Sequence, residues 1–185
     1  MRKLSIAISG RPGSGKTTYS RFIAKTYRLR YVSNGEIFRQ IAKERGLSLT
    51  ELHELAERDP SIDRMIDERA IEEAKKGGVV IDGHLAVWVL RKYVDLALIF
   101  IAPLEVRARR IAERDGIEFK RALEEIKLRE ESNRRRARDY YGVNIDDFSV
   151  ADLVVSTGKL DVKGVIKVIT SFIEEYKRLR PDIFQ

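Results

Sequence analysis

Short, largely apolar runs alternate with amphipathic stretches along the whole chain. The apolar runs predict five buried strands, at residues 4–9, 29–33, 79–81, 95–101 and 153–156. Such runs are typical of parallel strands covered on both faces, because a sheet with one wet face shows strict alternation. We therefore expect an α/β fold, a five-stranded parallel sheet with helices on both faces.

Helical spacing of apolar residues predicts the segments that connect these strands. The expected helices cover about residues 15–27, 37–42, 48–57, 60–76, 104–140 and 162–178. Ser48 and Glu51 form a capping box, and Pro60 stands at a first helical position. The long charged region after residue 104 is expected to break near Gly116. The helices between the second and third strands are expected to form an insertion.

The most specific pattern follows the first strand directly. Residues 10–18 read Gly10-Arg11-Pro12-Gly13-Ser14-Gly15-Lys16-Thr17-Thr18, and the next helix begins within them. Glycines at this spacing let backbone N–H groups surround phosphate oxygens at the positive end of the helix. Lys16 is expected to reach the β- and γ-phosphates, and Thr17 to take a Mg²⁺ position. The pattern predicts a three-layer P-loop NTPase fold that binds ATP or GTP.

Other residues narrow the class of enzyme. Asp82 ends the third strand beside the expected loop, where it could hold Mg²⁺ through water or only cap a turn. GTPases read guanine with an Asn-Lys-x-Asp segment, and the chain has none. The phosphate loop alone leaves the acceptor of a phosphoryl group open.

Two groups of side chains are candidates for the acceptor side. Arg129, Asn133 and Arg136 share one helical face, which could close on the transferring phosphoryl group or form a charged exposed surface. Ser33 and Arg39 follow the second strand at the edge where ligands bind in such sheets. They could hold the acceptor, or they could be a helix start and a surface arginine.

Composition limits the remaining classes. Apolar residues make up 43% of 185 residues, which is enough for one domain with its own core, and the absence of cysteine excludes disulfides. The net charge of +7 fits a polyphosphate ligand better than nucleic acid, because no aromatic residues interleave with the basic ones. We find no signal peptide or membrane segment and expect a cytoplasmic protein. Its charge-rich composition is typical of heat-adapted proteins.

Four segments together resemble a known family. They are residues 10–18, 33–39 (Ser33-Asn34-Gly35-Glu36-Ile37-Phe38-Arg39), 102–108 (Ala102-Pro103-Leu104-Glu105-Val106-Arg107-Ala108) and 129–136 (Arg129-Glu130-Glu131-Ser132-Asn133-Arg134-Arg135-Arg136). Over nearly its whole length the chain resembles archaeal-type cytidylate kinases, which are nucleoside monophosphate kinases. The resemblance implies Mg²⁺-dependent transfer of the γ-phosphoryl group of ATP to CMP or dCMP. Separately, we expect a monomer, and no membrane binding because no apolar run is long enough for a membrane helix.

The resemblance also assigns roles by position. Ser33 would lie in the acceptor site, and Arg39, Arg107 and Arg129 would hold the acceptor phosphate. Asn133 would approach the ribose, and Arg136 the reacting phosphates.

Two positions depart from the family pattern. Related bacterial enzymes have Asp in place of Asn133. Many relatives have Arg after the glycine of Asp82-Gly83, where this chain has His84. Asp82, Gly83 and His84 would line the acceptor site, although His84 could equally be a packing residue. His53 is expected at the surface or in packing.

We expect one domain over residues 1–185 with three parts. The core covers 1–33, 79–115 and 150–185, the monophosphate-binding insertion about 34–78, and the lid about 116–145. Two alternatives stay open: a kinase of this fold with AMP, UMP or dephospho-coenzyme A as acceptor, and an ATP-binding module that associates with RNA.

Overall fold

The computed structural model describes residues 3–184, apart from the side chains of residues 49, 50 and 53. The strands within this range are β1 (Ser5–Gly10), β2 (Arg30–Ser33), β3 (Val79–Asp82), β4 (Leu96–Ile101) and β5 (Leu153–Ser156). All neighbouring strands are parallel and follow the order β2-β3-β1-β4-β5. The expected parallel sheet is confirmed, and its central strand is the one that leads into the glycine-rich loop.

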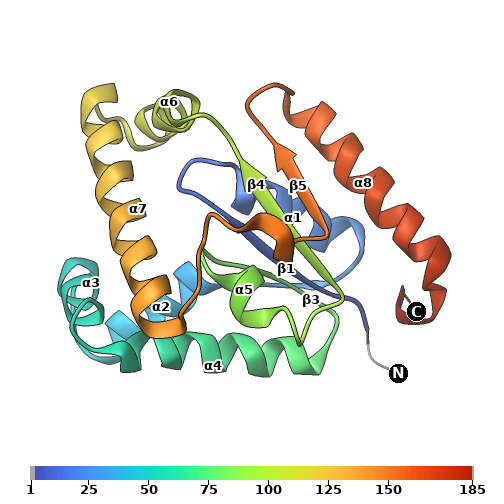
Figure 1. Ribbon diagram of the computed structural model, residues 1–185, viewed down its shortest axis with the longest axis horizontal. Coiled ribbons are helices and arrows are strands. Elements are labelled where there is room, and N and C mark those ends of the chain that lie inside the picture. Colours follow the sequence, from blue (N-terminus) through green and yellow to red (C-terminus); the bar gives the residue numbers. More distant parts are fainter. Residues whose placement is uncertain (1–2, 185) are drawn as a thin grey trace.

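Helices connect the strands and add an insertion after β2 (Figure 1). They are α1 (Lys16–Thr26), α2 (Asn34–Glu44), α3 (Leu49–Ala56), α4 (Pro60–Lys76), α5 (Ala86–Leu90), α6 (Leu104–Asp115), α7 (Phe119–Tyr141) and α8 (Val162–Leu179), with 3-10 turns η1 (Phe148–Val150) and η2 (Pro181–Phe184). The short helix α5 was not predicted, because five mostly apolar residues are too few to show a helical period.

The predicted helix ends are confirmed where their caps are described. The Ser48 hydroxyl accepts the Glu51 N–H at 3.2 Å, and the Glu51 carboxylate accepts the Ser48 N–H at 2.7 Å. Helix α6 ends at Gly116, whose φ of 65° is left-handed. This turn separates α6 from α7, as the sequence predicted.

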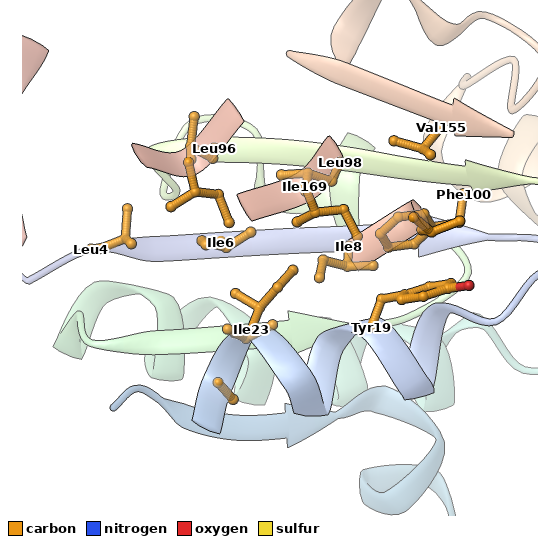
Figure 2. Packing of buried hydrophobic residues seen from close by; sticks show 14 of the residues in the cluster. Leu4, Ile6, Ile8, Tyr19, Ile23, Leu96, Leu98, Phe100, Val155 and Ile169 are labelled. Carbon is orange, nitrogen blue, oxygen red and sulfur yellow. The ribbon is translucent and has the colours of Figure 1, made fainter. Parts of the chain in front are cut away.

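Strand β1 sends successive side chains into opposite layers. Ile6 and Ile8 pack with Ile23 of α1 and Ile169 of α8 (Figure 2). Ala7 belongs to the cluster that α4 and α5 form on the other face. Helices therefore cover both faces of the sheet, and the buried β1 holds the loop that follows it at the carboxyl edge.

Two smaller apolar clusters lie outside these layers. One joins α2, α3 and α4, and the other joins α6 to α7 through side chains such as Ile111 and Ile126. Figure 1 shows α7 at the side of the molecule opposite α8, with its C-terminal end beside α3. The division into core, insertion and lid stays a prediction.

No helix in residues 3–184 combines the length and the apolarity that crossing a membrane requires. The side chain of His53 lies outside the described residues.

Candidate active site

The glycine-rich loop joins β1 to α1 in the strand–loop–helix arrangement that its sequence predicted. Gly13 and Gly15 have φ values of 79° and 89°, which residues with a side chain rarely adopt. A Cβ atom on Gly13 would lie 2.7 Å from the Arg107 carbonyl oxygen, and one on Gly10 would lie 2.6 Å from the Phe100 carbonyl oxygen. Glycine is therefore required here both for the turn and for close packing against β4 and α6.

Lys16 is the first residue of α1, and Gly15 caps the helix without a side-chain hydrogen bond. Desolvation lowers the pKa of Lys16 to about 8; Asp82 opposes this effect, while the charges of Arg129 and Arg114 add to it. Thr17 and Thr18 are exposed on the same turn. Cations that converge beside a helix N-terminus repel one another, and a polyanion would relieve that repulsion.

Asp82 lies at the carboxyl edge of the sheet between two other site residues. The strand register pairs it with Ile8 of β1 on one side and with Ser33 of β2 on the other. The Asp82 carboxylate is buried and accepts a hydrogen bond of 2.7 Å from the Tyr31 hydroxyl. Burial, together with this hydrogen bond, raises the pKa of Tyr31 to about 12.

The residues at this edge fit Mg²⁺. Thr17 and Asp82 offer hard oxygen ligands, and Tyr31 occupies only one of the two Asp82 carboxylate oxygens. Within the described residues no group of three or more His, Cys, Asp or Glu side chains could hold a metal. Mg²⁺ suits such a sparse site, because it usually keeps several waters and binds substrate phosphates.

The face of α7 that carries Arg129, Asn133 and Arg136 is split between two environments. Arg129 is exposed and has no ion pair with the described residues. Arg136 donates from Nη2 to the Asn133 side chain at 2.9 Å and from Nη1 to Asp63 of α4 at 2.7 and 3.0 Å. One arginine of the set is therefore free, while the other connects α7 to the insertion.

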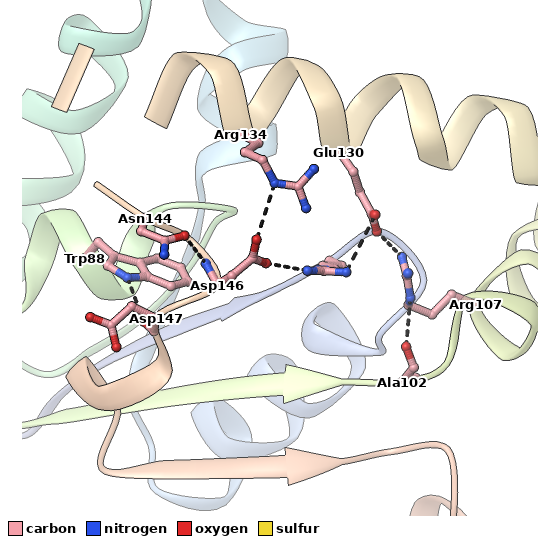
Figure 3. A network of polar contacts seen from close by, with 9 residues as sticks. Trp88, Ala102, Arg107, Glu130, Arg134, Asn144, Asp146 and Asp147 are labelled. Atoms are coloured by element: carbon pink, nitrogen blue, oxygen red, sulfur yellow. Dashed lines mark hydrogen bonds and ion pairs between the residues drawn. The ribbon is translucent and has the colours of Figure 1, made fainter. Parts of the chain in front are cut away.

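Arg107 is buried and holds the loop from behind. Its Nε donates to the Ala102 carbonyl oxygen at 2.9 Å, and its Nη1 donates to the Pro12 carbonyl oxygen at 3.2 Å and pairs with Glu130 of α7. Arg11 lies 3.7 Å from the same Glu130 carboxylate and also pairs with Asp146 (Figure 3). Ion pairs thus connect the loop to α7 and to the segment after it.

His84 follows Asp82 and Gly83 and lies against the loop. Together with Gly10, Arg11 and Asn133, it lines a small pocket between the loop, β4 and α7. Desolvation, and then the charges of Lys16, Arg129 and Arg136, keep the pKa of His84 well below its usual range. The imidazole is neutral and hydrogen-bonds to the backbone of Gly10, so it adds no cation at this position.

Ser33 and Arg39 stand at the start of α2. Ser33 is buried beside Asp82 and caps α2 without a side-chain hydrogen bond. The next residue, Asn34, packs closely against Gly83. Arg39 is exposed and makes no hydrogen bond or ion pair with the described residues. This edge of the sheet therefore combines an unpaired cation with a buried hydroxyl.

Sequence comparison assigns this arrangement to a family. Residues 5–159, which include the loop, Asp82 and all of α7, match the cytidylate kinase-like family. The chain belongs to that family.

Curated relatives share most of the chain. A cytidylate kinase from Staphylothermus marinus is 50% identical over 171 residues, covering 92% of this chain and 97% of the relative. A cytidylate kinase from Methanocaldococcus jannaschii is 45% identical over 176 residues, covering 94% and 99%. The resemblance to archaeal cytidylate kinases is therefore confirmed.

Solved structures of low sequence identity share the family fold. An uncharacterized protein from Eubacterium ventriosum has a TM-score of 0.73 at 22% identity, with 93% of this chain and 99% of that chain covered. Shikimate kinase from Aquifex aeolicus has a TM-score of 0.60 at 22% identity, covering 94% and 98%. These likenesses confirm the kinase-type P-loop fold.

Several residues of the site had not been found from the sequence. Glu130 and Asp146 pair with the arginines around the loop, and Tyr31 bonds Asp82. Arg110 and Thr157 contact the loop backbone. Their partners are distant in the chain, so no spacing pattern indicates them.

Proposed function

We propose that this chain is a cytidylate kinase that transfers the γ-phosphoryl group of ATP to CMP or dCMP. An acceptor phosphate oxygen bonds the γ-phosphorus as the bond to the β,γ-bridging oxygen breaks, giving CDP or dCDP and ADP. Family membership and relatives named cytidylate kinase support the proposal. The observation that carries it is the position of Lys16 at the start of α1, directly after the glycine-rich loop, with Asp82 and Arg129 near enough for their charges to act on it.

The donor side is the loop at residues 10–18. Its N–H groups and Lys16 hold the β- and γ-phosphates, and the half-buried position of Lys16 strengthens its attraction to them. Thr17 and, through water, Asp82 would hold Mg²⁺, which would draw charge from the phosphate oxygens when bound. The Tyr31 hydroxyl keeps the Asp82 carboxylate oriented toward that position.

The acceptor side is formed by β2, β3 and α7. Arg39, Arg107 and Arg129 hold the acceptor phosphate, and Ser33, Asp82, Gly83 and His84 line its site. Arg39 and Arg129 are unpaired among the described residues, and Nη2 of Arg107 makes no hydrogen bond with them. Arg39 and Arg129 are therefore available to a phosphate without the loss of a protein contact, whereas Arg107 is buried and offers only Nη2.

Asn133 and Arg136 complete the assignment on α7. Asn133 approaches the ribose, and Arg136 the reacting phosphates. Arg136 must exchange Asp63 for phosphate to act there, since its Nη1 is held by that carboxylate. Positioning and charge stabilisation supply the catalysis, so the site needs neither a covalent intermediate nor a strong base.

An acceptor panel tests the proposal. ADP release is measured with ATP and each of CMP, dCMP, UMP, AMP and dephospho-coenzyme A. We expect the highest kcat/KM with CMP or dCMP. A higher kcat/KM with UMP, AMP or dephospho-coenzyme A would identify that compound as the acceptor in place of CMP. An RNA-associated module would instead bind ATP without acceptor-dependent ADP release and would bind RNA in a salt-sensitive way.

The proposal also includes a monomeric, cytoplasmic enzyme. Light scattering coupled to size-exclusion chromatography tests the oligomeric state, with a mass near 21.3 kDa expected.

A further inference from the structure

Three successive carbonyl groups of the phosphate loop accept hydrogen bonds from outside it. The Pro12 carbonyl accepts from Arg107 Nη1 at 3.2 Å, and the Gly13 carbonyl accepts from Arg110 Nη1 at 3.3 Å. The Ser14 carbonyl accepts from the Thr157 hydroxyl at 2.9 Å. Side chains from α6 and from the end of β5 therefore surround the outer side of the loop.

These contacts determine where the loop N–H groups point. In a trans peptide the C=O and N–H groups point in opposite directions. Holding the Pro12 and Ser14 carbonyls outward therefore turns the Gly13 and Gly15 N–H groups to the inner side. The Ser14 N–H closes a turn on the Arg11 carbonyl at 3.1 Å, whereas those of Gly13 and Gly15 donate to no acceptor among the described residues. Both glycines are half-buried, and their unpaired N–H groups on the inner side of the loop are suited to an anion.

Thr157 is the central residue of this arrangement. It is fully buried, and its N–H donates to the Ile101 carbonyl at 2.8 Å, which fixes it beside β4. Arg110 binds it twice, from Nη1 to the Thr157 hydroxyl at 2.9 Å and from Nη2 to the Thr157 carbonyl at 2.6 Å. The hydroxyl oxygen accepts from Arg110, and its single proton has two carbonyls within reach. The Ser14 carbonyl is the nearer, at 2.9 Å, whereas the Ile101 carbonyl lies at 3.4 Å and already accepts the Thr157 N–H.

We propose that Thr157 and Arg110 are positioning residues that hold the phosphate loop in its binding conformation before ATP arrives. This proposal deepens the proposed function and rests on it for the identity of the donor. Thr157 is too deeply buried to touch a nucleotide, so it acts only through the loop backbone. Without the Thr157 hydroxyl, part of the free energy of ATP binding is needed to order the loop, so ATP affinity is weaker.

Thr157→Val tests the proposal, because valine keeps the shape of threonine and lacks the hydroxyl. Calorimetric titration with ATP, without acceptor, is expected to give a Kd about tenfold higher than that of the unmodified chain. KM for ATP rises by the same factor, while KM for CMP and kcat at saturating ATP stay within about twofold. Thr157→Ser retains the hydroxyl and is expected to restore ATP affinity.

Arg109→Met is the matched control. Arg109 is exposed, adjoins Arg110 on α6 and has no hydrogen bond or ion pair with the described residues. This variant is expected to bind ATP as the unmodified chain does. Circular dichroism establishes that each variant is folded at the assay temperature.

Arg110→Met provides a second test that stays informative if Thr157→Val does not fold. Inorganic tripolyphosphate is the probe, since it occupies a phosphate loop but lacks a base and a sugar. We expect Arg110→Met to weaken tripolyphosphate and ATP by equal factors. Weakening of ATP alone would show that Arg110 contacts the nucleoside, and would overturn its positioning role.

The two proposals fail in distinguishable ways. ATP binding by folded Thr157→Val that equals that of the unmodified chain overturns the positioning proposal, and so does Thr157→Ser behaving like Thr157→Val. Neither result concerns the acceptor. Failure of the unmodified chain to phosphorylate CMP overturns the proposed function, and the titrations with ATP and tripolyphosphate still test the loop.

Discussion

The phosphate loop and the C-terminal half of α7 face the same site, but they are held by different kinds of contact. The loop is fixed through its backbone, whose carbonyls accept hydrogen bonds from Arg107, Arg110 and Thr157. The α7 half is held mainly through side chains, as in the ion pair between Arg136 and Asp63. A backbone held in this way is preformed for its ligand, whereas a side-chain ion pair can be exchanged for a phosphate.

The α7 side also places carboxylates in an unfavourable environment. Besides Arg136–Asp63, Tyr141 donates to Asp67, and Arg135 pairs with Glu57 at 2.9 Å. Burial raises the pKa of Asp63, and burial together with the charge of Asp63 raises the pKa of Asp67 to about 6. Part of the stability of this contact therefore depends on pH.

Lys16→Ala is expected to have the largest effect on the loop side. Removing the ammonium from the phosphate site lowers turnover on the order of 10³-fold, because its contribution grows as charge develops in the transition state. The melting temperature is not expected to fall, since the fold disfavours the charged form of Lys16, as its lowered pKa shows. Steady-state ADP release and thermal unfolding measure the two effects.

Lys25→Ala is the control for this variant. Lys25 is exposed near the end of the same helix, so its loss removes a charge without touching the loop. Its turnover should match that of the unmodified chain. A Lys16→Ala enzyme of nearly full activity would contradict the donor-side assignment.

Arg129→Ala is expected to have the next largest effect, on the α7 side. The side chain has no ion pair within the described residues. Lys16 and Arg114 repel it while Glu125 and Asp115 attract it, so the fold gains little from it. We expect turnover to fall on the order of 10²-fold, while the free energy of unfolding stays within about 0.5 kcal/mol of that of the unmodified chain. Arg121→Ala, which removes an exposed arginine paired with Glu125 on the same helix, is the comparison variant. Unchanged turnover in Arg129→Ala would disprove the lid assignment.

The features of the loop could be predicted from the sequence, whereas the side-chain pairs that hold α7 could not. The loop, the capping box at Ser48 and the break at Gly116 are local patterns, in which neighbouring residues determine the backbone conformation. The Arg129–Asn133–Arg136 face could be read from helical spacing, but the side chain opposite it could not. Asp63 is 73 positions from Arg136, and no local pattern connects them.

The residues that support the phosphate loop could not be predicted either, because their partners are distant in the chain. Thr157 looks like an ordinary residue after a strand, and only the packing of β5 beside β4 brings its hydroxyl to the Ser14 carbonyl. Arg110 is one of four arginines in α6, and its neighbours Arg109 and Arg114 are exposed. Arg107 shows that such an arginine can be almost completely buried, which its charge alone would not suggest.

A double-mutant cycle with Asp63→Asn and Arg136→Met tests the link between α7 and the insertion. Both side chains are about 14% exposed, so removing one partner leaves a poorly solvated charge. Each single variant is expected to lower the free energy of unfolding by about 2–3 kcal/mol, and the double variant by clearly less than the sum. Denaturant unfolding provides these values. Additive losses would show that the pair contributes no coupling.

The activities of the same variants separate structure from catalysis. Arg136→Met removes the group proposed to reach the phosphates, whereas Asp63→Asn only frees it. We expect turnover to fall further in Arg136→Met than in Asp63→Asn at temperatures where both are folded. Equal losses would assign Arg136 a structural role alone.

The smallest expected effect is the pH dependence that Asp67 gives to the α7 side. Its pKa of about 6 in the folded chain exceeds the usual value of 3.8, so the folded state binds more protons than the unfolded state between these pH values. Stability from this group is therefore fully present below about pH 4 and is lost as the pH rises through 6. The full loss is about 3 kcal/mol, of which about 1.4 kcal/mol falls between pH 5 and pH 7.5.

Asp67→Asn isolates this contribution, because the amide oxygen still accepts from Tyr141 but cannot ionise. Denaturant unfolding at pH 5 and pH 7.5 should show a smaller difference in the variant, with the variant more stable at pH 7.5. Glu68→Gln, on the exposed side of the next position in α4, is the control and should keep the original pH dependence. An unaltered difference in Asp67→Asn would mean that Asp67 is ionised at no cost, and that the α7 contact is no more sensitive to pH than the loop.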